Sequence, residues 1–210
     1  MSALPKIDLI PGWDCYDWRN AKTILEHGHP REWDDVLRVL SAFRLKHSDL
    51  ARKGGRKSPI SNAIDSEFYR LGWMERKFET AILVDGVARR SPTHKVDCFK
   101  GKIALEVEWN NKDPFYDRDL NNFRLLYDLR IADVGIVVTR SSELMDDLQH
   151  DKFGLGRDTA GTGSSTTHFS KLETKVLGGG AGGCPVLVFA MTSGLYEDDR
   201  RLNEPPNANA

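Results

Sequence analysis

Apolar residues along the chain fall into runs with helical spacing and runs with strand spacing. Intervals of three and four predict amphipathic helices from Arg31 to Leu50, after Pro59, and from Asp119 to Arg130. Ser142 to Gln149 predicts a further short helix. Shorter apolar runs predict strands at 78–87, with a turn at Asp85-Gly86, at 133–139 and at 185–192.

The stretch from Val96 to Trp109 predicts a β-hairpin. We place its turn at Lys100-Gly101, because glycine tolerates the positive φ of a tight two-residue turn. In that register Phe99 pairs with Lys102 and Asp97 pairs with Ala104. Side chains alternate along a strand and directly paired residues share a face, so the hairpin has an acidic and an apolar face. The acidic face carries Asp97, Ala104, Glu106 and Glu108; the apolar face carries Ile103, Leu105, Val107 and Trp109.

The acidic face of this hairpin predicts a cation site. Three like charges on one short ribbon repel one another unless a cation lies between them. Mg²⁺ is held by one or two carboxylates together with water and phosphate oxygens. Asp97, Glu106 and Glu108 therefore indicate a carboxylate metal site.

The order of the predicted elements favours an α/β (α+β) fold with a mixed central β-sheet flanked by helices. A chain of 210 residues is long enough for one substantial domain, so we expect a single domain over 1–210. Within it we expect an irregular, aromatic-rich N-terminal segment at 1–30. We also expect a flexible Gly/Ser/Thr-rich loop at 152–183 and a polar tail at 197–210.

Composition excludes several classes of protein. Hydrophobic content of 40% and charged content of 29% are typical of a globular protein in water. No apolar run approaches the roughly 20 residues that span a bilayer, and the N-terminus lacks a signal-peptide core. We therefore expect a cytoplasmic protein without a membrane partner. Three widely spaced cysteines fit neither a zinc site nor a disulfide framework.

A net charge of −1 gives no overall attraction to nucleic acid, so DNA binding requires local basic patches. The loop at 51–59 carries Lys53, Arg56 and Lys57, and it either follows a phosphate backbone or is an ordinary solvated loop. A second basic cluster at 89–95 precedes the acidic hairpin. After the hairpin, Asn110, Asn111 and Lys112 contact bases or form an ordinary turn. Glu67 is either a surface charge or faces the acidic hairpin.

The candidate chemistry is metal-assisted hydrolysis of a phosphodiester. Divalent ions lower the pKa of a bound water and neutralise charge on the leaving 3′ oxygen, so the protein need not supply a nucleophile. No Ser or Cys has a base at recognisable spacing, which disfavours covalent hydrolysis. The Gly/Ser/Thr-rich run at 156–168 and the glycine-rich run at 178–183 lack the lysine of a P-loop, so we expect no nucleotide cofactor.

These residues also resemble a known family. Asp97, eight residues and then Glu106-Val107-Glu108 resemble the PD-(D/E)xK nuclease motif with its final Lys replaced. The hairpin DCFKGKIALEVEW, the following DPFYDRDLNNFRLLYDLRIADVGIVV and the late PVLVFAM strand are similar to type II restriction endonucleases of the BglII and BstYI type. The likeness covers roughly residues 55–145 and one later strand.

This resemblance implies a restriction-endonuclease-like fold and a metal site built from Asp97, Glu106 and the Val107 carbonyl. It implies that Glu108 is catalytic, with either Glu108 or a metal-bound water as the general base. It also implies Mg²⁺ as cofactor, with Mn²⁺ as a substitute, in a bacterial or archaeal cell. A homodimer would cut both strands of a palindromic site in double-stranded DNA and leave 5′-phosphate ends. The helix at 119–130 would then lie at the dimer interface, or its apolar side would pack on its own sheet.

Three hypotheses follow for function. The leading one is a Mg²⁺-dependent type II restriction endonuclease. The others are another PD-(D/E)xK nuclease, acting in repair or on branched DNA, and a DNA-binding protein whose acidic cluster is inert.

Overall fold

The computed structural model describes residues 3–52, 58–156 and 165–200. Seven strands form one mixed sheet in the order β1-β2-β8-β7-β6-β5-β4, and β3 pairs with β9 in a small separate sheet. The strands are β1 (Lys6–Ile7), β2 (Trp13–Trp18), β3 (Leu45–Lys46), β4 (Met74–Val84), β5 (Val87–Lys100), β6 (Ile103–Val107), β7 (Val134–Arg140), β8 (Val186–Met191) and β9 (Tyr196–Glu197). The helices are α1 (Ala21–Gly28), α2 (Pro30–Ala42), α3 (His47–Ala51), α4 (Pro59–Arg70), α5 (Pro114–Asp128), α6 (Ser142–Gln149), α7 (Phe169–Leu177) and the 3-10 helix η1 (Ser193–Leu195).

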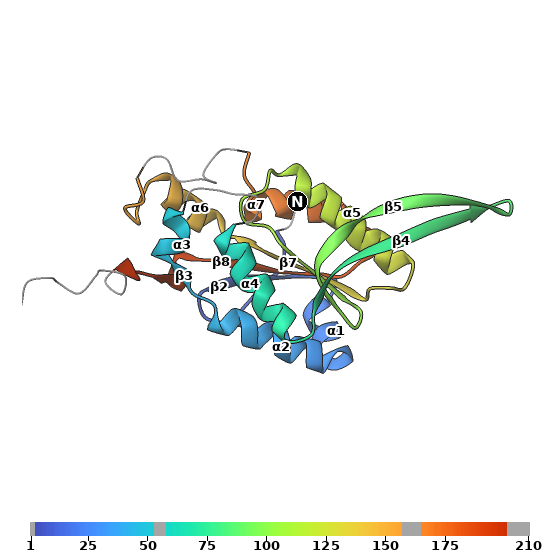
Figure 1. The fold of residues 1–210 in the computed structure, drawn as a ribbon, viewed down its shortest axis with the longest axis horizontal. Coiled ribbons are helices and arrows are strands. Elements are labelled where there is room, and N and C mark those ends of the chain that lie inside the picture. The colour runs from blue at the N-terminus through green and yellow to red at the C-terminus, as the bar shows by residue number, and fades with distance from the viewer. Residues whose placement is uncertain (1–2, 53–57, 157–164, 201–210) are drawn as a thin grey trace, which may run out of the picture.

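Helices cover both faces of the large sheet (Figure 1). Helices α1, α2, α4 and α6 bury residues such as Leu25, Val36 and Phe68 in a core on one face. Helices α5 and α7 bury residues such as Phe123 and Leu172 in a second core on the other face. The predicted α/β (α+β) architecture with a mixed central sheet is therefore confirmed. None of the described helices is both long enough and apolar enough to cross a membrane.

The centre of the sheet is parallel. Strand β6 pairs in parallel with β7, and β7 with β8, whereas β5 is antiparallel to β6 and β2 is antiparallel to β8. The carboxyl ends of β6, β7 and β8 therefore lie at one edge of the sheet. This edge is where open α/β sheets place their ligands.

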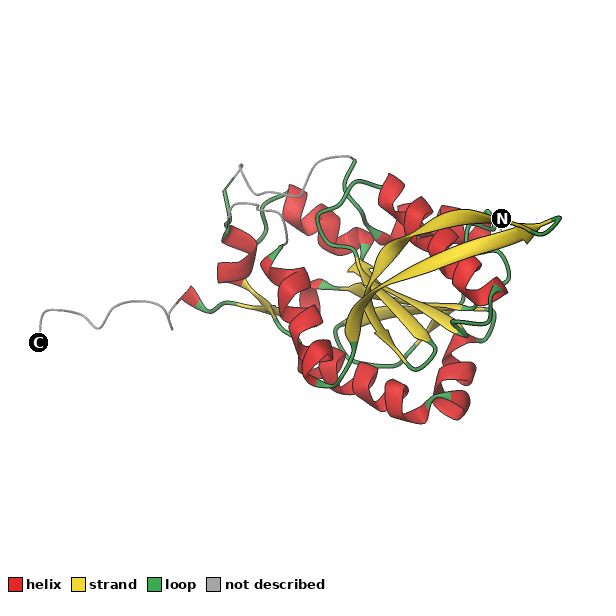
Figure 2. Cartoon of the chain, turned by 45° about the vertical axis from the view of Figure 1, so that its right-hand side comes forward, coloured by secondary structure: helices red, strands yellow, loops and turns green. Residues whose placement is uncertain are grey.

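Strands β4 and β5 extend beyond the rest of the sheet as a long two-stranded ribbon (Figures 1 and 2). The backbone pairing of β5 with β6 is limited to residues 98–100 of β5, whereas its pairing with β4 continues out to Val84↔Val87. The turn at Asp85-Gly86 is confirmed. Both residues have positive φ, 49° and 80°, as a two-residue hairpin turn requires. We call residues 79–92 the arm.

The prediction of an irregular segment at 1–30 is wrong. Strand β2 pairs along its full length with β8 inside the central sheet, and α1 begins at Ala21. In β2 the buried Trp13 and Cys15 alternate with Asp14 and Tyr16, which are half-buried. This is the period-two pattern of a strand with one covered face.

The flexible loop predicted at 152–183 is also wrong, because it contains α7. Phe169, Leu172 and Val176 lie at helical spacing and are buried against α5 and the sheet. Residues 157–164 lie outside the described part of the chain. The polar tail begins later than 197, since β9 pairs with β3, and residues 201–210 also lie outside the description.

Several element boundaries differ from their predictions. The helix predicted at 31–50 is α2 followed by β3 and α3, and the helix predicted at 119–130 begins at Pro114. Proline suits the first turn of a helix because its missing N–H would have no helical partner there. The short helix at 142–149 and the buried strands after 133 and 185 are confirmed.

The hairpin turn is displaced from its predicted place. Lys100 pairs with Ile103 and Phe99 with Ala104, so the turn residues are Gly101 and Lys102. Gly101 has a φ of 56°, and a side chain there would collide with the carboxylate of Glu32. The register differs by two residues from the predicted one. Because side chains alternate with a period of two, each predicted face keeps its residues.

Candidate active site

Asp97 and Glu106 meet across the β5–β6 hairpin. The regular pairing ends at Cys98↔Leu105, and the next two residues are joined through their side chains. The Asp97 amide lies 3.3 Å from Glu106 Oε2, and the Val107 amide donates to Asp97 Oδ2 at 3.2 Å. The corrected register thus places Asp97 beside Glu106, where the predicted register placed it opposite Ala104.

Glu106 and Glu108 are both buried, each with 1% of its surface exposed. Glu106 Oε1 has no hydrogen-bond partner among the described residues. Burial raises the pKa of Glu106 well above its usual range, and the charges of Asp119, Asp97 and Glu108 raise it further. A buried acid with one unsatisfied oxygen indicates that a positive charge belongs beside it.

Glu108 lies on the same edge and has several polar partners. Asn111 Nδ2 donates to Glu108 Oε2 at 2.8 Å, and Arg118 Nη2 lies 3.5 Å from Oε1. Burial raises the pKa of Glu108 to about 9, and the charge of Asp119 and a hydrogen bond to Asp119 add to this effect. Burial beside other acids therefore favours the protonated form of Glu108.

Two residues of α5 complete the site and were missed from the sequence. Asp119 is 1% exposed, and Arg118 Nε donates to Asp119 Oδ1 at 2.8 Å. Asp119 lies among Tyr116, Leu120 and Phe123 on the buried side of α5. An acid on the apolar face of a helix was the available signal, because charged residues are almost never fully buried without a partner. We call Asp97, Glu106, Glu108 and Asp119 the carboxylate cluster.

Helix α4 contributes Asp65 and Tyr69 to the same region, but not Glu67, which the sequence suggested. Glu67 is exposed and pairs with Arg70, so it does not face the hairpin. Instead, the Tyr69 hydroxyl donates to the Asp97 carbonyl at 3.0 Å. Asp65 is fully buried and accepts from the Cys98 thiol at 3.6 Å.

Two loops beside the cluster are held together by a buried arginine. Arg140, at the end of β7, donates to the Thr167 carbonyl through Nε at 3.2 Å and Nη2 at 3.1 Å. Its guanidinium lies 4.9 Å from the ring centroid of Trp109. Backbone hydrogen bonds join 111–113 to 165–167. The segment that follows β6 is therefore held in place beside the carboxylate cluster.

The predicted DNA contacts fall into three groups. Lys53, Arg56 and Lys57 lie outside the described residues. Asn110 and Lys112 are exposed beside the cluster, as a contact to DNA requires. Asn111 is engaged with Glu108, so its side-chain amide helps to orient that acid.

The described His, Cys, Asp and Glu side chains contain no group of three or more arranged to hold a metal. The donor set nevertheless suits Mg²⁺, which takes one or two protein carboxylates and completes its shell with water and phosphate oxygens. The Glu106 carboxylate accepts from the Asp97 amide, the Asp97 carboxylate accepts from the Val107 amide, and Glu106 Oε1 remains available. The Val107 carbonyl is the third predicted ligand, and the amide of the same residue donates to Asp97.

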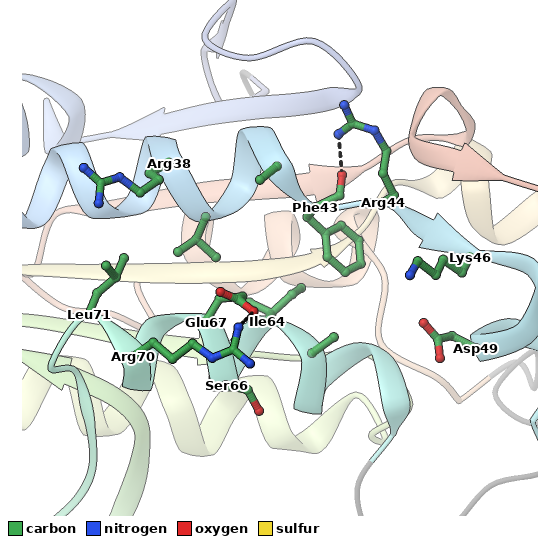
Figure 3. Close-up of a pocket in the computed structure, with 13 residues that line it drawn as sticks. Arg38, Phe43, Arg44, Lys46, Asp49, Ile64, Ser66, Glu67, Arg70 and Leu71 are labelled. Atoms are coloured by element: carbon green, nitrogen blue, oxygen red, sulfur yellow. Dashed lines mark hydrogen bonds and ion pairs between the residues drawn. The ribbon is translucent and has the colours of Figure 1, made fainter. Parts of the chain in front are cut away.

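A groove of 520 Å³ lies between α2 and α4 (Figure 3). Apolar residues such as Val39, Phe43 and Ile64 line it, together with cations such as Arg38 and Arg44. No member of the carboxylate cluster lines it. The groove is therefore separate from the candidate active site.

The family follows from a comparison of the whole chain. The family model described as restriction endonuclease BglII/BglIII matches residues 13–191. This range runs from β2 to the end of β8 and includes every member of the carboxylate cluster. Comparison with curated protein sequences gives no match. The chain therefore belongs to the BglII/BglIII restriction endonuclease family.

Proposed function

We propose that the protein is a type II restriction endonuclease that cuts both strands of a palindromic site in double-stranded DNA. It would use Mg²⁺, which Mn²⁺ can replace, and it would leave 5′-phosphate ends. The observation that carries this proposal is the contact of Asp97 with Glu106 and Val107 inside the family match. A restriction endonuclease family with such a carboxylate edge supports hydrolysis of a phosphodiester.

Each residue of the site has a separate task in this proposal. Asp97, Glu106 and the Val107 carbonyl would hold Mg²⁺, which supplies an acidified water and neutralises charge when bound. The Val107 amide fixes Asp97 and the Asp97 amide fixes Glu106. Glu108, oriented by Asn111, accepts a hydrogen bond from the attacking water. The water oxygen bonds to phosphorus as the bond to the 3′ oxygen breaks; the proton that the water loses passes to the general base, Glu108 or a second water, and the 3′ oxygen takes a proton from water.

The proposed DNA contacts lie in two places, beside this edge and on the arm. Asn110 and Lys112 lie next to it, and Arg89 and Arg90 lie on the arm, whose strand β5 continues through residues 93–96 to Asp97. Cations at these places suit a phosphate backbone that passes over the carboxylates.

A symmetric cut also requires two copies of the chain. Palindromic sites and two-fold protein symmetry go together, so we propose a homodimer. The apolar side of α5 is used on its own sheet, because Leu120, Phe123 and Leu126 are buried there. An interface at α5 would therefore use its outer side, where Phe115 and Leu129 are 36% and 44% exposed. Sedimentation at several concentrations would give the mass of the species in solution.

Digestion of a sequenced genome tests the function. With Mg²⁺ we expect discrete fragments whose sequenced ends share one palindromic site, and no fragments from Asp97→Ala or Glu106→Ala. A smear, or fragments that persist in both variants, would contradict the proposal. Cleavage limited to branched DNA would favour a structure-specific nuclease, and binding without cleavage under Mg²⁺ or Mn²⁺ would favour an inert acidic cluster.

A further inference from the structure

The carboxylate cluster combines four acids with a cation from α5. Arg118 is the one described cation in an ion pair with these acids. Its Nη2 lies 2.7 Å from Asp119 Oδ1 and 3.5 Å from Glu108 Oε1. Strand β6 itself brings only carboxylates to this edge of the sheet. Positive charge from the protein therefore reaches the site from a different element.

The guanidinium of Arg118 is anchored along one side only. Its Nε and Nη2 both contact Asp119 Oδ1, and its central carbon lies 4.4 Å from the ring centroid of Phe115. Within the described residues, no hydrogen bond or ion pair engages Nη1. The side chain keeps 28% of its surface exposed, whereas Asp119 and Glu108 are each 1% exposed. The Nη1 donors of a partly exposed guanidinium, anchored by a buried acid, therefore remain available to a ligand.

Hydrolysis of a phosphodiester needs such donors. Negative charge builds up on the non-bridging oxygens of the phosphate in the transition state, and fixed cations stabilise it more than they stabilise the substrate. Arginine suits this task because its planar fork matches phosphate and keeps its charge. An arginine already fixed by a buried acid needs little rearrangement when DNA binds.

We infer that Arg118 binds the phosphate at the position of cleavage and stabilises the charge that develops there, with Asp119 and Glu108 as its positioning residues. This inference rests on the proposed nuclease function. Arg118 stays protonated throughout and forms no bond; it only donates hydrogen bonds to phosphate oxygens. Its assignment adds a residue of α5 to a site otherwise built from the β5–β6 hairpin.

The first test is the Arg118→Ala variant with the full-length chain and a plasmid that carries the cleaved site. We expect the single-turnover cleavage rate under Mg²⁺ to fall by about 10²- to 10³-fold. Binding to the same DNA with Ca²⁺ in place of Mg²⁺ should weaken by much less than the cleavage rate falls. The matched control is Arg38→Ala, which removes an exposed arginine from α2 and should leave both values unchanged.

A second variant separates phosphate binding from simple neutralisation of Asp119. If Arg118 only balanced the charge of Asp119, the double variant Arg118→Ala/Asp119→Asn would recover the rate. We expect it to remain as slow as Arg118→Ala. We also expect Arg118→Lys, which keeps the charge without the fork, to fold and to cleave at an intermediate rate. Recovery in the double variant, or wild-type cleavage by Arg118→Ala, would overturn the inference.

The wild-type chain separates this inference from the function on which it rests. Wild-type cleavage that Asp97→Ala abolishes and Arg118→Ala leaves intact would remove Arg118 alone from the site. A wild-type chain that cleaves no DNA under Mg²⁺ or Mn²⁺ would overturn both proposals together.

Discussion

Strand β5 belongs to two regions of very different character. Near the carboxylate cluster Val96, Cys98 and Phe99 are buried between the two helical layers, with exposures from 0% for Val96 to 4% for Phe99. In the arm, by contrast, Leu83 and Val84 of β4 are 70% and 45% exposed, and Val87 of β5 is 57% exposed. Asp97 is half-buried among these residues, and residues 93–96 separate it from the arm.

The difference shows that one strand can hold the carboxylates rigidly in the core and also extend beyond the sheet. Buried side chains fix the β5–β6 hairpin, which we call the inner hairpin, from both faces. Asp97 and Glu106 are therefore held by packing as well as by hydrogen bonds. The arm is held mainly by the backbone pairing of two strands, which is weakly stable without a covered face. We therefore expect changes in the inner hairpin and its supporting helices to have large effects, and changes in the arm to have small ones.

The largest effect should follow loss of either paired carboxylate. We expect Asp97→Asn and Glu106→Gln to lower the cleavage rate by about 10³-fold or more, because each removes a proposed metal ligand. The free energy of unfolding should stay the same or rise, since each change relieves repulsion within the cluster. Single-turnover cleavage and urea unfolding of the same samples would measure both.

Glu67→Gln is the control for this pair, because it neutralises an exposed acid on α4 that does not face the cluster. It should change neither quantity. A cleavage rate within tenfold of wild type for Glu106→Gln would show that the inner hairpin is not the catalytic element.

The next largest effect should come from the packing behind the hairpin. Phe123 is fully buried, and its ring fills the space beside Gly135 on β7. We expect Phe123→Ala to lower the free energy of unfolding by about 3–5 kcal/mol. Leu83→Ala on the arm should change it by less than about 0.5 kcal/mol. If urea unfolding showed equal decreases in the free energy of unfolding for the two variants, the contrast between the packed sheet and the arm would be contradicted.

The same contrast explains what the sequence could and could not predict. Alternation placed Asp97, Glu106 and Glu108 on one face, and this conclusion survived a two-residue error in register because the period of a strand is two. Helix α7 was missed because Gly, Ser and Thr around it masked the spacing of Phe169, Leu172 and Val176. Asp119 and Arg118 were missed because their partner Glu108 lies on another element, and only the folded chain brings the two together.

A smaller effect should appear as a pH dependence of the metal-free protein. The pKa of Glu108 is about 9 in the folded chain against an ordinary value of 4.5, so the folded state binds this proton more tightly than the unfolded state does. The stabilisation is complete below about pH 4.5 and is lost as the pH rises through about 9. We therefore expect the free energy of unfolding to fall between these limits in the presence of a chelator.

Mg²⁺ should offset this loss, because it binds the ionised carboxylates of the folded chain. At about a hundred times its Kd it would add about 2.7 kcal/mol. Glu108→Gln should show a flatter dependence on pH, since the titrating group is gone. Thermal unfolding between pH 5 and 9, with and without Mg²⁺, would measure both slopes, and a metal-free protein that gains stability as the pH rises would refute the argument.

The smallest effect on stability should come from the cations of the arm. Arg89 and Arg90 are exposed, so we expect Arg89→Ala/Arg90→Ala to change the free energy of unfolding by less than about 0.5 kcal/mol. If these residues bind phosphates, the slope of log Kd against log salt should become shallower by roughly 0.9 for each phosphate that the variant no longer neutralises. Glu79→Ala on the same ribbon is the control, because an acid does not bind phosphate. An unchanged salt slope would show that the arm projects away from DNA, whereas a large fall in stability would show that it is part of the folded body.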